Sequence, residues 1–231
     1  MRYGYDYTYI LVLIGALISF LASLNVNGTF KRYSKSGNMR NITSQQAASA
    51  ILRNAGINDV RIEQVRGNLT DHYSPNEKVL RLSDSVYGST SVAAIGVAAH
   101  ECGHAIQHQV GYAPLKLRSV SVPIANIGSK LSWPIILIGL LLGQMGLARM
   151  GVILFVFVVA FQLITLPVEF DASHRALKVL EERNILTDNE LGGARKVLTA
   201  AALTYVAALF SSILQLLRLI LLTQGGNRRR R

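Results

Sequence analysis

Four long apolar stretches constrain the fold of this 231-residue chain more than any other feature of its sequence. They cover Tyr9–Leu24, Trp133 to about Leu147, Met150–Leu166 and Leu198–Leu222. A hydrocarbon core about 30 Å thick is crossed by about 20 helical residues, which is near the length of each stretch. Because a bilayer offers no hydrogen-bond partners, each stretch should be helical. The sequence therefore predicts a mainly α protein with four membrane spans.

Details of these stretches refine the prediction. The first has no convincing small-residue cleavage site after it and only Arg2 as a basic residue before it, which favours an uncleaved anchor. Apolar residues 120–127 can belong to the same broken helix as the second stretch, which forms a hairpin with the third. Arg218 interrupts the fourth stretch, so we expect it to snorkel, to pair, or to mark where the span ends.

A pentad between the first and second stretches carries the chemistry: His100-Glu101-Cys102-Gly103-His104 matches the HExxH pattern. The surrounding residues 91–109 are apolar on most sides, which predicts a buried helix. At about 100° per residue, His104 lies roughly 40° around that helix from His100, so both imidazoles can reach one metal ion. Glu101 lies beside them, where it can hold a water molecule. This arrangement is the minimal equipment for zinc-assisted peptide hydrolysis.

A catalytic zinc site usually takes three protein ligands, so one more is needed. His108 is on the same helix, but three ligands in successive turns of one straight helix could not all reach one ion. The other candidates, Glu169, Asp171 and His174, follow the third apolar stretch. Pro167 suits the first turn of a new helix, which would place Glu169 near a helix start, and we predict Glu169 as the third ligand. For Asp171 and His174 we favour capping, pairing with Arg175 or support of a ligand.

Several strings of this chain resemble the YugP-type bacterial membrane zinc metallopeptidases. They are AAHECGHAIQ, LPVEFDASHRAL, GYAPLKLRS, IANIGSKLSWP, LTYVAALFSSILQLLR and LTDHYSPNEKVLRLSDSVY. The resemblance implies a neutral zinc metalloprotease integral to the membrane, with His100 and His104 as ligands and Glu101 as catalytic base. A more distant likeness is to the HtpX and CAAX-processing membrane peptidases, whose HExxH is followed by ExxxD. The Glu of that pattern is Glu169 here, but its Asp position holds Ser173.

The predicted organisation follows from the spans and the motif. The parts are an anchor at 1–24, an extramembrane domain at 25–118, a transmembrane hairpin at 119–167, an extramembrane helix at 168–197, and a final span with a basic tail at 198–231. Both extramembrane parts lie on one side because a two-span hairpin separates them. We expect them to form a small α+β, zincin-like catalytic unit.

Local signals predict structure within residues 25–118. Thr43 to Gln46 has capping-box character and should start a helix that stops at Gly56. Val60 and Ile62 alternate with polar residues, and Val79–Leu82 follows a turn, so a small sheet is expected. Val79–Leu82 is the candidate edge strand, to which an extended substrate could add; the alternative is a hairpin that only packs on the helix of the pentad. Asp71-His72-Tyr73 is interpreted as a turn or as a donor of a hydrogen bond to the transition state.

Basic residues flanking the spans predict the orientation. Twelve of them fall on the catalytic side: Lys31, Arg32, Lys35, Arg40, Lys116, Arg118, Lys130, Arg175, Lys178, Arg183, Arg195 and Lys196. This excess predicts a multi-pass plasma-membrane protein whose catalytic side is cytoplasmic. Four full spans would put the tail at 228–231 outside, whereas a last segment that ends near Arg218 or re-enters would keep it inside. The net charge of +11 is attributed to anionic lipid and not to nucleic acid, because no basic–aromatic stacking platform is evident.

Other classes of protein are less consistent with the sequence. The single cysteine, Cys102, excludes an intramolecular disulfide and suits a small buried residue. Few ionisable residues within the spans argue against a transporter. A zinc-stabilised scaffold or chaperone-like factor is the alternative to a protease of peptides or membrane proteins. The sequence specifies neither a cleavage site nor an oligomeric state; Gly139 and Gly143 favour packing within the hairpin over dimerisation.

Overall fold

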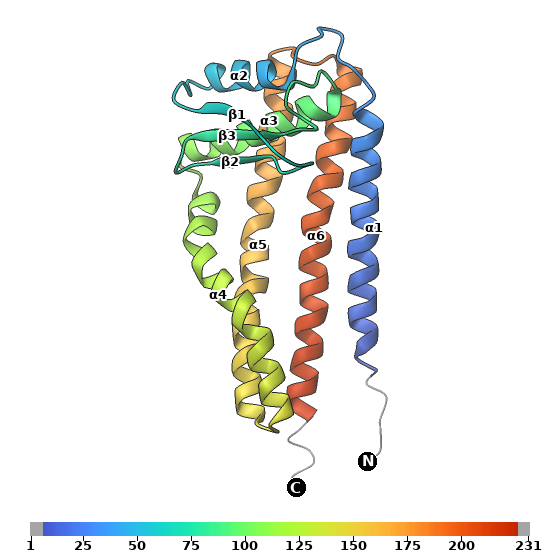
Figure 1. Cartoon of the computed structure of the whole chain (residues 1–231), viewed down its shortest axis with the longest axis vertical. Coiled ribbons are helices and arrows are strands. Elements are labelled where there is room, and N and C mark those ends of the chain that lie inside the picture. The colour runs from blue at the N-terminus through green and yellow to red at the C-terminus, as the bar shows by residue number, and fades with distance from the viewer. Residues whose placement is uncertain (1–6, 226–231) are drawn as a thin grey trace. The chain divides into compact units, whose positions relative to one another are not determined.

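The computed structural model describes residues 7–225, which form six helices and three strands (Figure 1). Arg2 and the tail at 228–231 lie outside the described residues. The elements in chain order are α1 (Tyr9–Tyr33), α2 (Ser44–Asn54), β1 (Arg61–Val65), β2 (His72–Ser74), β3 (Val79–Ser83), α3 (Val92–Gln109), α4 (Ala113–Leu141), α5 (Met145–Glu182) and α6 (Asp188–Gly225).

Four helices, α1, α4, α5 and α6, are long and apolar enough to cross a membrane, which confirms the predicted four-span, mainly α fold. Residues 120–127 belong to the same helix as the second stretch, as expected, since α4 continues through Pro123 and Pro134. The predicted end of the second span near Leu147 was wrong. The helix ends at Leu141 because Gly143 adopts a left-handed conformation, with φ of 67°, in the short turn before α5.

The prediction that Pro167 starts a new helix was also wrong, because α5 runs through it to Glu182. Proline inside a helix removes one backbone hydrogen bond, so packing must compensate. A stripe of buried residues at four-residue spacing does so: Val168, Ala172, Ala176 and Leu180. Tertiary burial of this stripe outweighs the local preference for a break, and Glu169 stands in the interior of a long helix.

The chain forms two compact units, here called the helical unit and the α+β unit. The helical unit comprises the described parts of Met1–Ser23, Leu117–Leu166 and Thr204–Arg231. Its core contains Ile136 of α4, Val152 and Phe155 of α5, and Leu219 of α6. The α4–α5 hairpin is tightly packed, since a Cβ on Gly139 would lie 2.4 Å from the Ala148 nitrogen.

Arg218, the one charge expected to be costly in the fourth stretch, is paired within the helical unit. Its guanidinium carbon lies 4.0 Å from the centre of the Tyr9 ring. A cation over an aromatic face is attracted by the ring quadrupole, which lowers the cost of burying the charge. Helix α6 continues past Arg218 to Gly225, so this residue does not mark a helix end.

The α+β unit comprises Leu24–Lys116 and Pro167–Leu203. Its core joins α2, the sheet and α3 to the adjoining turns of α5 and α6. Helix α2 begins as predicted: the Thr43 side chain accepts from the Gln46 N–H, and the Gln46 side chain accepts from the Thr43 N–H. Gly56, with φ of 73°, follows the end of the helix.

The sheet has the order β1-β3-β2, with β1 parallel and β2 antiparallel to β3. The predicted sheet is therefore present, but Val79–Leu82 was wrongly predicted as an edge, because β3 is the central strand. Its residues Val79, Leu80 and Leu82 are fully buried, as expected for a strand paired on both sides. The segment predicted as a turn at His72 and Tyr73 forms the edge strand β2, paired with β3.

Candidate metal centre

The pentad lies on helix α3, which is packed in the interior of the α+β unit. Ser91 caps it by accepting a hydrogen bond from the Ala94 N–H, and the helix ends at Gln109, close to the predicted limits. Twelve of its eighteen residues are buried, which leaves the two histidines partly accessible at one surface. The rings of His100 and His104 lie edge to face, with centroids 4.8 Å apart. The two imidazole rings are therefore close enough to bind the same ion.

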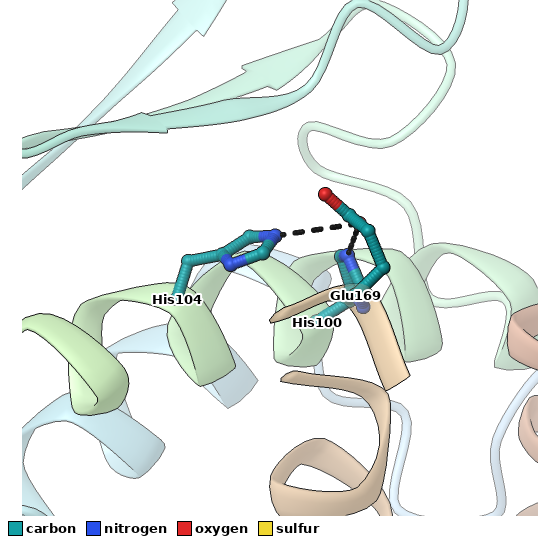
Figure 2. Close-up of side chains that lie close together, drawn as sticks. All are labelled: His100, His104 and Glu169. Atoms are coloured by element: carbon teal, nitrogen blue, oxygen red, sulfur yellow. Dashed lines mark ion pairs between the residues drawn. The ribbon is translucent and has the colours of Figure 1, made fainter. Parts of the chain in front are cut away.

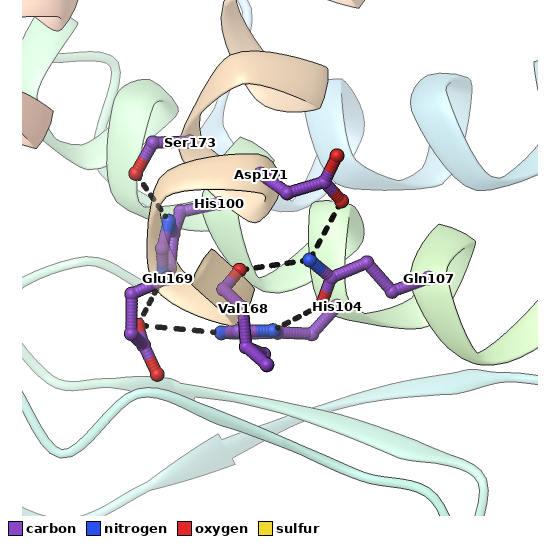
Figure 3. Close-up of polar contacts among 7 residues, drawn as sticks. All are labelled: His100, His104, Gln107, Val168, Glu169, Asp171 and Ser173. Atoms are coloured by element: carbon purple, nitrogen blue, oxygen red, sulfur yellow. Dashed lines mark hydrogen bonds and ion pairs between the residues drawn. The ribbon is translucent and has the colours of Figure 1, made fainter. Parts of the chain in front are cut away.

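Gly103 allows α5 to reach this surface. A Cβ at this position would lie 2.4 Å from the Ala172 carbonyl oxygen and 3.0 Å from its carbon, so the two backbones touch where the glycine stands. No other residue permits so close an approach, because any Cβ would collide with the facing main chain. This contact brings the segment that contains Glu169 and Ser173 next to the two histidines (Figures 2 and 3).

Glu169 completes a cluster with both rings. Its Oε2 atom lies 3.3 Å from Nε2 of His100 and 3.7 Å from Nε2 of His104, and the three candidate ligand atoms all lie within 4.8 Å of one another (Figure 2). Ligands of a tetrahedral zinc ion, each about 2.1 Å from the metal, stand about 3.4 Å apart. Two imidazoles and one carboxylate, with a fourth position open, form the donor set of a catalytic zinc site. The residues present fit this ion in chemistry and in spacing.

Gln107, one turn after His104, determines which nitrogen of that ring faces the cluster. The Gln107 side-chain nitrogen donates to the Val168 carbonyl and to Asp171 Oδ2, both at 2.8 Å, so its oxygen must point the other way (Figure 3). That oxygen lies 3.0 Å from His104 Nδ1 and can only accept. Nδ1 therefore carries the proton in the neutral ring, and the lone pair of Nε2 faces Glu169.

His100 has a different partner on its far side. Its Nδ1 atom lies 3.0 Å from the Ser173 hydroxyl, which can accept from it while Nε2 faces Glu169 (Figure 3). A hydroxyl group, and not a carboxylate, makes this contact. A metal-binding histidine usually donates its second ring nitrogen to such an acceptor, which fixes the orientation of the ring.

Sequence reasoning assigned no role to Gln107. It is fully buried and holds three groups at once, namely His104, the Val168 carbonyl and Asp171. A signal was present: a glutamine inside an apolar helix, three residues after a candidate ligand, needs buried partners and shares a face with that ligand. Asp171 was expected to support a ligand directly. It instead contacts Gln107, which in turn contacts His104, so its support is indirect.

The electrostatics of His104 reflect the nearby carboxylates. Burial disfavours the imidazolium and lowers the pKa of His104, but hydrogen bonding to Glu169 and the charges of Glu101 and Glu169 outweigh it. The net effect is a pKa above the ordinary value. The pocket is therefore negative enough to favour a cation, whether that cation is a proton or a metal ion.

Glu101 lies next to His100 on α3 and is almost buried, with 8% of its surface exposed. It is not part of the three-ligand cluster. Among the described residues, no hydrogen bond or ion pair joins its carboxylate to another group. A buried carboxylate beside such a cluster can accept a proton from a water molecule held between them.

The remaining candidates lie apart from the cluster. His108 is exposed, and its Nδ1 atom contacts the Tyr73 hydroxyl at 2.9 Å. His174 is exposed, and Asp171 pairs with Arg175, as expected. Cys102 is fully buried, with its thiol 3.6 Å from the Ala48 carbonyl, and burial raises its pKa well above the ordinary value. This thiol is a packing residue on the opposite side of α3, as the sequence suggested.

Comparison with known proteins adds an independent line of evidence. Residues 8–224 match the model of a family described as "Putative neutral zinc metallopeptidase". The chain is also 46% identical over 219 residues to "Putative membrane protease YugP" of Bacillus subtilis (strain 168), an alignment that covers 94% of this chain and 97% of the relative. No solved structure matches the chain.

Proposed function

The chain belongs to the neutral zinc metallopeptidase family, and from this premise we propose that it is a membrane-integrated zinc metalloprotease with Glu101 as its general base. One observation carries the proposal: Nε2 of His100, Nε2 of His104 and a carboxylate oxygen of Glu169 converge within 4.8 Å. Two of these residues are separated from the third by a helical hairpin. A cluster of this composition, assembled from distant parts of the chain, supports a metal site more strongly than the pentad alone.

His100, His104 and Glu169 would hold the ion. A zinc ion bound there supplies Lewis-acid activation of water and of the scissile carbonyl. Glu101 takes a proton from the attacking water and delivers it to the leaving amine, which avoids expulsion of an unprotonated nitrogen. Its almost complete burial, with 8% exposed, keeps bulk water from competing for that proton.

Gln107 and Ser173 would act by positioning. Each accepts the Nδ1 proton of one imidazole, Gln107 from His104 and Ser173 from His100, so that both Nε2 lone pairs stay aimed at the ion. Gln107 is itself held by the Val168 carbonyl and Asp171. The two histidines therefore need no rearrangement when the metal binds, which favours affinity and keeps the water close to Glu101.

The proposed substrates are peptides or segments of membrane proteins, cleaved by a multi-pass enzyme of the plasma membrane whose catalytic side is cytoplasmic. Four helices long and apolar enough to cross a membrane support the bilayer location, and the basic residues that flank the candidate spans favour the cytoplasmic side. A nucleic-acid partner is not proposed. Extended substrates can pair with an edge of the sheet, and β2 offers such an edge beside α3.

The test uses the full-length protein in detergent, with Glu101→Gln and Glu169→Ala compared with the parent. Bound zinc per chain and chelator-sensitive cleavage of an unfolded protein are measured in parallel. We expect about one zinc in the parent and in Glu101→Gln, with turnover reduced about 10²- to 10⁴-fold in Glu101→Gln. Glu169→Ala should lose both zinc and turnover, because two ligands hold the ion far more weakly than three.

Three outcomes would contradict different parts of the proposal. Full activity in Glu101→Gln would contradict the role of the general base. Zinc bound by a parent that cleaves neither this substrate nor the membrane proteins of its own host, together with unfolding of the protein by chelators, would favour a zinc-stabilised scaffold. A folded parent that binds no zinc would remove the metal centre altogether.

A further inference from the structure

A cavity of the α+β unit lies between α1 and α6, apart from the metal centre. It has a volume of about 390 Å³ and is lined by Asn25, Thr29, Arg32, Tyr33, Arg195, Lys196, Thr199, Ala200 and Leu203. Three of these nine residues are basic and none is acidic. We propose that this cavity binds the phosphate group of an anionic phospholipid.

The two helix segments that form the cavity are held together locally. A Cβ on Gly193 of α6 would lie 2.8 Å from the Tyr33 ring and 3.1 Å from a Val92 methyl group, so α6 lies directly against the end of α1 here. The helices run in opposite directions, side by side (Figure 1). Their lining residues recur about every four positions on each helix, so one face of α1 meets one face of α6.

Three cations share the cavity without a carboxylate to neutralise them. Among the described residues, no ion pair joins Arg32, Arg195 or Lys196 to an aspartate or glutamate, whereas other surface cations such as Lys78 and Arg81 have such partners. Like charges close together repel, so an anion between them would be attracted by all three and would relieve their repulsion. Two guanidinium groups suit phosphate oxygens in particular, because each offers a planar fork of N–H donors.

The remaining lining residues form a gradient that suits an amphiphile. Because the helices are antiparallel, Arg32 and Arg195 lie at one end of the cavity and Asn25 and Leu203 at the other. The two ends are seven to eight residues apart on each helix, or about 10–12 Å. The hydroxyl groups of Thr29 and Thr199 lie between these ends. A phosphate at the basic end would leave its glycerol beside the hydroxyls and its chains beside Leu203.

The position of the cavity along the chain favours a lipid over a soluble phosphate. Its α1 residues begin directly after the apolar stretch that ends at Leu24, and its α6 residues extend into the stretch that begins at Leu198. Lipid phosphates occupy the level where apolar spans become polar, and basic pockets between helices at this level are suited to anionic headgroups. The site thus lies where such a lipid is already concentrated.

The experiment measures thermal unfolding of the full-length protein in an uncharged maltoside detergent while a short-chain lipid is added. Dihexanoyl-phosphatidylglycerol should raise the unfolding temperature in a saturable manner, and dihexanoyl-phosphatidylcholine should not. Inorganic phosphate is the third probe. The double variant Arg195→Gln/Lys196→Gln should bind phosphatidylglycerol roughly tenfold more weakly or worse. The control Lys31→Gln/Lys35→Gln removes the same charge outside the cavity and should stay within about twofold of the parent.

Three results would overturn the proposal. An equal loss of affinity in both double variants would show that general charge attraction explains the binding. An equal shift with inorganic phosphate would reassign the cavity to a soluble anion. An absence of any shift with phosphatidylglycerol would exclude the lipid site. If the first double variant does not fold, Arg32→Gln tests the same cavity from the other helix and should also weaken lipid binding.

Discussion

Helices α1 and α3 are both rich in apolar residues, but α3 is buried within the protein and α1 is mostly exposed on its surface. Both are apolar around most of the circumference, so neither helix is strongly amphipathic. Yet twelve of the eighteen residues of α3 are buried, whereas Gly15 is the one buried residue among the 25 of α1. Side chains such as Leu13 and Leu17 of α1 are more than half exposed.

The difference lies in the polar residues that each helix contains. In the apolar stretch of α1, Ser19 contacts the Ser211 hydroxyl of α6 at 2.8 Å, and no other side chain of the stretch makes a side-chain hydrogen bond to another helix among residues 7–225. Helix α3 contains His100, Glu101, His104 and Gln107 in its interior turns, and the histidines and the glutamine have polar partners in α5. Uniform hydrophobicity thus indicates removal from water, and the polar residues indicate whether lipid or protein provides the surroundings.

The first prediction concerns the packing of α3 within the protein and has the largest expected effect. Gly103→Ala places a Cβ 2.4 Å from the Ala172 carbonyl oxygen and should force α5 away from α3. We expect a loss of about 3 kcal/mol of stability, with loss of bound zinc. Unfolding in detergent and zinc content are the measurements.

Gly96→Ala is the matched control on the same helix. Its Cβ would lie 3.4 Å from the Ala194 side chain, an ordinary contact, so this variant should keep its zinc and gain up to about 1 kcal/mol of stability from helix propensity. Equal behaviour of the two variants would contradict the close backbone contact at Gly103.

The second prediction tests the lipid side. Leu17, in the middle of the apolar stretch of α1, is 57% exposed. On a water-facing helix Leu17→Lys would be harmless, but within a bilayer a lysine at the helix centre costs about 2.5–3.5 kcal/mol. We expect the variant to misplace the amino-terminal segment, read from the accessibility of an amino-terminal tag to protease in oriented vesicles. Leu17→Ala should behave as the parent does.

The third prediction compares the two residues that support the histidines of the metal centre, Gln107 and Ser173. Gln107→Leu keeps the volume but removes the acceptor of His104 and the donor to Asp171, so zinc affinity should fall about 10- to 100-fold. Ser173→Ala removes one contact of His100, and its effect should be smaller. Competition with a chromophoric chelator measures both. A larger loss in Ser173→Ala would reverse the order of importance inferred for the two supports.

The smallest effect is expected at Cys102. Because its thiol is fully buried and its pKa is raised, the thiolate form is scarce and reagent has no access. Iodoacetamide should leave the folded protein unmodified and label it after denaturation. Cys102→Ala should retain activity. Rapid labelling of the folded protein would show that α3 is more accessible than its burial indicates.

Sequence patterns predicted α3 to within one residue at its start, and α2 with its capping box, because capping residues act locally. They failed where distant contacts decide. Pro167 suggests a helix start, but the buried stripe from Val168 to Leu180 keeps α5 continuous. The pattern of β3 resembles that of an edge strand until its two neighbours are known.

The same distinction applies to the metal centre. Helical periodicity alone pairs His100 with His104 and puts Ser173 on the face of Glu169, so these neighbours were predictable. The role of Gln107 depends on the Val168 carbonyl and Asp171, which are brought to it by the tertiary contact at Gly103. A local rule reaches only the contact of Gln107 with His104, three residues away, and does not connect Gln107 with residues so far apart in the chain.

The hairpin of α4 and α5 has a consequence for the synthesis of this protein. His100 and its partner Ser173 are 73 residues apart in the chain, and the whole of α4 and the first part of α5 are made between them. When both histidines have just left the ribosome, Glu169 has not yet been added to the chain. The three-residue cluster is therefore incomplete on the nascent chain until the hairpin has been made, so a metal ion cannot find its third ligand there before that point.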